Sequence, residues 1–159
     1  MRLTVYTDYA LRLLMYLAVK DGGLATIAEV AKSYGISKNH LMKVAHQLGQ
    51  AGYVDTLRGR GGGLRLATPV EAITIGDVVR RTEPDMAVVA CLNPVDAPCA
   101  IKSCCVLRRA LAQAGAAFLD VLDGYSLADL VKPRSPLRGL LAIDAPRRVR
   151  TPRPAPPAA

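Results

Sequence analysis

Apolar residues recur with helical spacing in residues 1–20, the first strongly hydrophobic stretch of the chain. Asp8 and Arg12 interrupt this stretch, so it is neither an uninterrupted membrane span nor a typical signal peptide. Intervals of three and four place its apolar positions on one face of a helix: Tyr6, Tyr9, Ala10, Leu13, Leu14 and Leu17. The pattern predicts an amphipathic helix packed on the core of a cytoplasmic protein.

Two shorter helical segments follow, separated by a glycine turn. Thr26 and Glu29 have the spacing of a capping box, in which each side chain bonds the other residue's backbone N–H. We expect this helix to run to about Tyr34 and to end at Gly35, and the next to begin at Ser37. The second helix has apolar positions at Leu41, Val44, Ala45 and Leu48. Together the two predict a helix-turn-helix.

Residues 53–57 and 64–67 resemble two strands of a hairpin, and residues 58–63 form a tip with two arginines and four glycines. A glycine-rich tip alone would suit any hairpin loop. Directly after a helix-turn-helix, the two arginines favour a DNA-binding wing.

Beyond the hairpin, Thr74 is expected to cap a helix that ends near Pro84, and residues 86–105 lack periodicity. A long helix is predicted from Cys105 to about Leu122, with an apolar seam of Leu107, Leu111, Ala114, Phe118 and Val121. Such a seam suits packing within the domain as well as packing on a partner. Because a winged helix closes its own core, we favour a second subunit, which makes the protein a homodimer.

The fold class expected is mainly α with a small β-hairpin wing. The domains expected are a winged helix-turn-helix at 1–84, a cluster-binding loop at 85–105, a dimerisation helix with a short following helix at 105–131, and an extension at 132–159, largely disordered from 147.

The composition is that of a soluble globular protein, and the distribution of charge indicates which part of the chain would bind DNA. Of 159 residues, 51% are hydrophobic and 21% charged, as in globular proteins. The formal net charge is +8, but the extension from Lys132 carries +6 of it. Residues 37–65 nevertheless hold five Lys or Arg residues against Asp55 alone, which supplies a local positive field.

The second helix of the pair is the candidate recognition helix, since the major groove of B-DNA admits one helix. Asn39 and Lys43 can read base edges, whereas Ser37 and Lys38 suit phosphates, and His40 lies with them at the helix start. Arg58 and Arg60 at the wing tip would enter or flank the minor groove.

Four cysteines fall within fifteen positions: Cys91, Cys99, Cys104 and Cys105. A chain without an export signal favours metal or redox chemistry over structural disulfides. Paired zinc knuckles are absent from the sequence, and side chains of adjacent cysteines diverge, so we expect three of the four to be ligands. A cluster at a helix N-terminus suits this set, and a redox disulfide suits it nearly as well.

Four motifs in order, at residues 6–12, 35–41, 58–63 and 72–80, resemble the iron-sulfur regulators related to IscR, and within them the nitric-oxide-sensing repressors. The resemblance extends from Met1 to about Val131. It implies that Cys91, Cys99 and Cys105 bind the cluster, although the gap between the first two is longer than usual and Cys104 is an extra candidate.

Asp8 has two interpretations. From the residues alone it is a first-turn carboxylate that pairs with Arg12 at i+4. The resemblance implies instead that Asp8 reaches the cluster of the partner subunit as its fourth ligand. Three cysteines and Asp8 would leave one ligand for each iron, which favours a 4Fe-4S cluster over a 2Fe-2S cluster.

The function expected is therefore a homodimeric repressor, not an enzyme, that binds an operator in double-stranded DNA and releases it when nitric oxide destroys the cluster. The first alternative is a regulator of iron-sulfur biogenesis that senses cluster supply through a 2Fe-2S centre. An alternative of another class is a thiol oxidoreductase using Cys104 and Cys105, but the sequence has no C-x-x-C motif.

Overall fold

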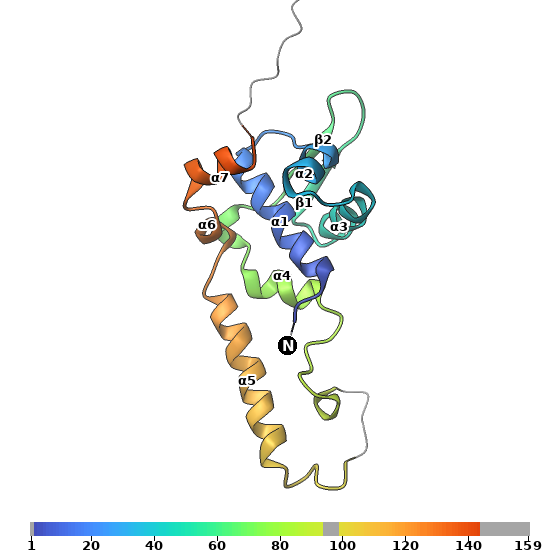
Figure 1. Ribbon diagram of the computed structural model, residues 1–159, viewed down its shortest axis with the longest axis vertical. Coiled ribbons are helices and arrows are strands. Elements are labelled where there is room, and N and C mark those ends of the chain that lie inside the picture. Colours follow the sequence, from blue (N-terminus) through green and yellow to red (C-terminus); the bar gives the residue numbers. More distant parts are fainter. Residues whose placement is uncertain (1, 94–98, 144–159) are drawn as a thin grey trace, which may run out of the picture.

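The computed structural model describes residues 2–93 and 99–143. Within them the chain is mainly helical with one two-stranded antiparallel hairpin, which confirms the expected fold class (Figure 1). The elements in chain order are α1 (Val5–Lys20), α2 (Ile27–Tyr34), α3 (Lys38–Gln50), β1 (Val54–Leu57), β2 (Gly63–Leu66), η1 (Val70–Ala72), α4 (Ile75–Thr82), η2 (Ala90–Leu92), α5 (Val106–Asp123), α6 (Leu127–Leu130) and α7 (Arg134–Leu140).

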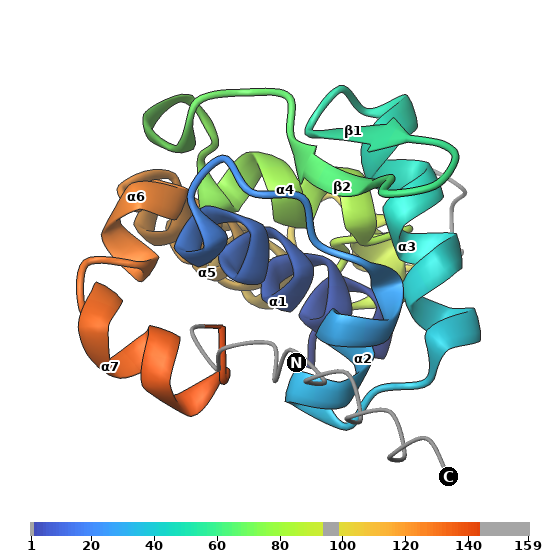
Figure 2. The ribbon, with the colours of Figure 1, turned by 90° about the horizontal axis from the view of Figure 1, so that it is seen from above.

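Helix α1 is the centre of the fold, as its apolar face predicts. Thr4 caps it by accepting a hydrogen bond from the Thr7 N–H, and the helix packs against α3, α4, α6, α7 and β2. Figure 2 shows it surrounded by these elements. Leu13 and Leu14 are fully buried. Helix α1 therefore connects α3, the candidate recognition helix, with α4 and the C-terminal helices.

Local capping explains where α2 and α3 begin and end. Both hydrogen bonds of the Thr26 and Glu29 capping box are present, and Gly35 ends α2 with φ +66°. Ser37 precedes α3 as expected, but its hydroxyl makes no capping hydrogen bond. The buried face of α3 is the predicted one: Leu41, Val44, Ala45 and Leu48.

The expected hairpin is present: β1 pairs with β2 in an antiparallel register that places Val54 opposite Leu66 and Leu57 opposite Gly63. Leu64 is buried and bridges to Ala25, which joins the wing to the segment before α2. The base of the wing is thus fixed to the helix-turn-helix.

Helix α5 projects away from the other helices, and the cysteine segment, whose described residues are 85–93 and 99–105, lies along it near its far end (Figure 1). Its C-terminal end lies beside α4 and α6. None of its residues is buried. The 18-residue helix is joined to α4 at its C-terminal end and contacts η2 nearer its N-terminal end.

The extension from residue 132 contains a helix, α7, which the sequence analysis did not predict. Arg138 Nη1 donates to the Val19 carbonyl at 3.2 Å, and Leu141 is buried against the core. The proline-rich composition concealed this helix, because Pro136 lies in its first turn, where proline is tolerated. The stretch expected to be disordered from residue 147 lies outside the described residues. No described helix is long and apolar enough to cross a membrane.

Candidate DNA-binding surface and cysteine segment

The predicted recognition residues form one exposed surface at the start of α3. Ser37, Lys38, Asn39, His40 and Lys43 are all exposed, on the side opposite the buried apolar face. Helix α3 packs on α1 and α2, so this surface is carried by a rigid support. The arrangement suits insertion of the N-terminal half of α3 into a major groove.

His40 differs from its neighbours in contacting α1. Its ring centroid lies 6.0 Å from that of Tyr9, with the rings tilted by 32°. Together with Lys43 and three further residues of α1 and α3, these side chains line a largely apolar hollow of about 290 Å³. His40 therefore lies at the edge of the recognition surface, where α1 meets α3.

The wing tip exposes Arg58 and Arg60. Gly59 and Gly61 have φ of +98° and +84°, so the backbone takes conformations that other residues rarely adopt. A side chain at Gly62 would lie 2.2 Å from the Leu57 carbonyl oxygen. The glycines thus allow a turn tight enough to present both arginines at the tip.

Between α3 and the wing lies a hollow that brings three side chains together: Met42, His46 and Arg58 all line it. His46 was not among the predicted site residues, yet it is exposed beside Arg58. Its position three residues after Lys43 was the available signal, since i+3 residues share a helix face. We add His46 and Met42 to the candidate surface.

One basic residue of this region, Arg65, is paired with an acidic side chain. Arg65 on β2 donates to Asp55 on β1, with its Nη2 3.1 Å from Oδ2. This cross-strand pair neutralises the one arginine of the strands. The positive field therefore comes from the wing tip and the start of α3.

The cysteines lie on both sides of the undescribed residues 94–98. All four are free thiols: Cys91 in η2 and Cys105 are partly buried, whereas Cys99 and Cys104 are exposed. Arg108 bonds to both partly buried cysteines. Its Nε donates to the Cys91 carbonyl at 3.2 Å, and its backbone N–H donates to Cys105 Sγ at 3.4 Å. Arg108 therefore contacts both the backbone of Cys91 and the thiol of Cys105.

Within the described ranges, the side chains of Cys, His, Asp and Glu do not gather in threes as a ready-made metal site. The donor set nevertheless fits a soft metal group. Reduced thiols are available, and Cys105 occupies the N-cap of α5, where backbone N–H groups and the helix dipole favour a thiolate. Cys104 Sγ instead donates to the Ile101 carbonyl at 3.5 Å. These contacts distinguish Cys105 from its neighbour.

Asp8 lies in the first turn of α1 and is paired within its own helix. Its Oδ1 accepts a hydrogen bond from Arg12 Nε at 2.9 Å, and its side chain remains 46% exposed. The Arg12 guanidinium also lies over the Tyr34 ring, 5.7 Å from its centroid. The structure of the single chain thus shows the local ion pair and leaves Asp8 open at the surface.

Glu83 is a residue that the sequence analysis missed. It follows α4, at the entrance to the cysteine segment, and its Oε1 accepts hydrogen bonds from the Thr4 N–H at 2.8 Å and the Thr4 hydroxyl at 3.1 Å. Thr7 Oγ1 lies 2.5 Å from the same oxygen. The cysteine segment therefore begins at a bond to the first turn of α1, the turn that carries Asp8.

Matches to known proteins cover nearly the whole described fold. The profile of the Rrf2 family, described as iron-dependent transcriptional regulator, matches residues 3–133. The chain is similar to the HTH-type transcriptional regulator NsrR of Bacillus subtilis (strain 168), with 51% identity over 144 residues, which span 90% of this chain and 99% of the relative.

Two solved structures have a similar fold. The first is CymR, the global cysteine regulator of B. subtilis, with a TM-score of 0.69 and 27% identity over 84% of this chain and 98% of that one. The second is T. potens IscR, with a TM-score of 0.67 over 84% of this chain and 88% of that one, and 24% identity, so it supports the fold alone.

Proposed function

Since this chain belongs to the Rrf2 family of transcriptional regulators, we propose that it is a homodimeric repressor that binds operator DNA and releases it when nitric oxide attacks an iron-sulfur cluster. The chain is a DNA-binding regulator and not an enzyme, which removes the thiol oxidoreductase from consideration. What is proposed is the sensor, the dimer and the signal.

The observation that carries the proposal is the attachment of the cysteine segment at both of its ends. At one end Glu83 bonds the first turn of α1, and at the other Cys105 is the N-cap of α5. Helix α1 packs in turn on the recognition helix α3. A chemical change among the cysteines therefore has a short, continuous route to the DNA-binding surface.

Cys91, Cys99 and Cys105 would hold the cluster, with Asp8 of the partner subunit as the fourth ligand. One ligand for each iron favours 4Fe-4S over 2Fe-2S. When bound, the cluster supplies iron that reacts with nitric oxide. Arg108 would serve this site through two hydrogen bonds, one to the Cys91 carbonyl and one to the Cys105 thiol. Asp8 offers a harder and more weakly held ligand than a thiolate.

DNA recognition follows from the exposed surface of α3 and the wing. Asn39 and Lys43 would contact base edges in the major groove, and Ser37 and Lys38 the phosphates. The hydroxyl of Ser37, unused in capping, suits that role. Arg58 and Arg60 would follow the adjacent minor groove.

Dimerisation is proposed through the outer face of α5. Leu107 and Val121, two full heptads apart, are 65% and 62% exposed, and Val106 next to Leu107 is 66% exposed. Exposed apolar side chains in a row are expected to be covered by another surface. A second copy of α5 offers a matching stripe.

The test begins with protein purified without oxygen. We expect broad visible absorption, close to four iron and four sulfide per chain, and a dimer by sedimentation. Adding nitric oxide should bleach the absorption and release a duplex selected by the protein from a random pool. A 2Fe-2S stoichiometry with no response to nitric oxide would support the biogenesis regulator instead. DNA binding that is equal with cluster, without iron and with nitric oxide would refute the sensor.

A further inference from the structure

We propose that the ion pair between Arg80 of α4 and Asp123 of α5, seated against Gly76, is the joint that sets the angle of α5 to the DNA-binding domain, and with it the half-site spacing that the dimer accepts. The inference rests on the proposed function, because it assumes a dimer that joins through α5. Arg80 and Asp123 are positioning residues here, since neither is part of the DNA surface.

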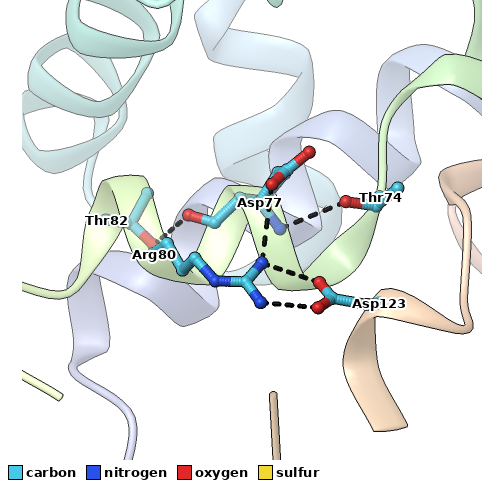
Figure 3. A network of polar contacts seen from close by, with 6 residues as sticks. Thr74, Asp77, Arg80, Thr82 and Asp123 are labelled. Atoms are coloured by element: carbon cyan, nitrogen blue, oxygen red, sulfur yellow. Dashed lines mark hydrogen bonds and ion pairs between the residues drawn. The ribbon is translucent and has the colours of Figure 1, made fainter. Parts of the chain in front are cut away.

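The pair has a geometry that fixes orientation as well as distance. Arg80 Nη1 donates to Asp123 Oδ1 at 2.7 Å and Nη2 to Oδ2 at 2.5 Å, so the contact is bidentate. Figure 3 shows the two parallel bonds between α4 and the last turn of α5. A bidentate pair holds two planar groups in one plane, which a single contact does not. Asp77 adds a longer contact to Nη1 at 3.5 Å.

Gly76 provides the seat for the carboxylate. A Cβ at this position would lie 1.8 Å from Asp123 Oδ1 and 2.8 Å from its Cγ. Any side chain at Gly76 would therefore push Asp123 and the end of α5 away from α4. Since Gly76 lies in a helix without a positive φ, close approach and not backbone conformation explains the glycine.

Backbone bonds hold the same end of α5 from its other side. The Ile75 N–H donates to the Tyr125 carbonyl at 2.9 Å, and the Leu127 N–H donates to the Ile73 carbonyl at 2.8 Å. Ile73 and Leu127 are fully buried. These contacts attach the connection after α5 to the start of α4, and the ion pair then fixes the direction in which the helix leaves.

The length of α5 turns a small change of angle into a large displacement. Its 18 residues span about 27 Å, so a tilt of about 10° at the joint moves the far end by roughly 5 Å. One base pair rises only about 3.4 Å along the duplex. With a fixed joint, the two recognition helices of the dimer would fit half-sites at one spacing only. A loose joint would let them bind half-sites at several spacings.

The Arg80 guanidinium keeps the pKa of the Asp123 carboxyl below its ordinary value by donating hydrogen bonds to it, which favours the charged form of the carboxylate. Both side chains are partly exposed, at 40% and 38%. A pair so exposed contributes little to stability. Its loss should be visible in geometry and not in folding.

The experiment compares Asp123→Asn with wild-type protein, both with cluster, on duplexes derived from one selected by the wild type. One duplex keeps the selected spacing and others carry one base pair inserted or deleted between the half-sites. We expect Asp123→Asn to remain dimeric with full cluster content. Its preference for the selected spacing should fall about tenfold, the equivalent of one mismatched base pair.

Gly76→Ala should reproduce the loss of spacing preference by displacing the same carboxylate. Asp21→Asn is the matched control, because it breaks another exposed pair between elements, Asp21 with Arg134, at 2.6 Å and away from α5. Wild-type spacing preference in a folded, dimeric Asp123→Asn would overturn the proposal. If the wild type itself is monomeric or indifferent to spacing, the proposed dimer fails first and this inference with it.

Discussion

Thr7 and Glu83 are 76 residues apart in the chain, yet Thr7 Oγ1 lies 2.5 Å from Glu83 Oε1. Thr7 is fully buried in α1, and Glu83 marks the entrance to the cysteine segment. Thr82 Oγ1 lies 2.9 Å from the same hydroxyl and itself donates to the Val78 carbonyl. A continuous set of hydrogen bonds thus joins the first turn of α1 to the last turn of α4.

Thr7→Val should lower the free energy of unfolding by about 1–3 kcal/mol, because it puts a methyl group of similar volume in place of the buried hydroxyl that bonds Thr82 and Glu83. Thr68→Val is the control, since the Thr68 hydroxyl also donates to a carbonyl, that of Gly52 at 2.9 Å, but at an exposed site. Its loss should stay below about 0.5–1 kcal/mol. Urea denaturation of both variants measures the difference, and equal losses would contradict the role given to Thr7.

Asn39→Ala should relax sequence preference, whereas Arg60→Ala should weaken binding to all duplexes. Loss of a base contact removes about 1–3 kcal/mol of discrimination against the wrong base. Loss of a phosphate contact lowers the slope of log affinity against log salt concentration by about one unit. Titrations at several salt concentrations, with selected and scrambled duplexes, separate the two effects. Lys132→Ala, at a position 75% exposed between α6 and α7, controls for loss of charge. An unchanged ratio of specific to nonspecific affinity in Asn39→Ala would remove Asn39 from base readout.

Local rules explain why much of this fold was predictable. The Thr26 and Glu29 capping box and the Gly35 turn depend on residues three to nine positions apart, so the sequence contains the whole signal. The apolar face of α3 was likewise complete in its own repeat. The wing followed from strand alternation and the glycines at its tip.

His46 was missed despite a local signal, whereas the other missed features depend on partners far along the chain. Arg80 and Asp123 are 43 residues apart, and Glu83 is 79 residues from Thr4. No repeat or local motif records such pairs, because tertiary packing alone brings them together. Helix α7 was missed for a related reason: burial of Leu141 against distant residues outweighs its proline-rich composition.

Cys91→Ser, Cys99→Ser and Cys105→Ser should each abolish the visible absorption and the bound iron, whereas Cys104→Ser should retain both. At Cys105 the serine hydroxyl can still cap α5, so helix content should not fall. Circular dichroism and iron assay on anaerobically purified variants check both statements. If Cys105→Ser kept full visible absorption while Cys104→Ser lost it, Cys104 and not Cys105 would be the third cysteine ligand.

Removal of residues 147–159 should leave the dimer, the cluster content and the choice of operator unchanged. The segment has four arginines and four prolines and few apolar side chains, so it lacks the means to bury a core. Its charge should still speed association, an effect that fades at high salt. Sedimentation and association rates at two salt concentrations provide the test, and a monomeric truncated protein would contradict it.

Asp8→Ala separates the two roles that this carboxylate can have. As half of an exposed i,i+4 pair with Arg12, it would contribute only about 0.3–0.5 kcal/mol of stability. As the ligand given to the partner's cluster, it would tie the first turn of α1 to the sensor, and α1 packs on the recognition helix. Asp8→Ala should therefore retain part of the cluster on three cysteines and lose most of the difference in operator affinity before and after nitric oxide. Glu29→Gln is the matched control, because it changes a first-turn carboxylate of α2 and keeps its capping geometry. If Asp8→Ala loses only stability and responds to nitric oxide like the wild type, the coupling must run through Glu83 and Thr7 alone.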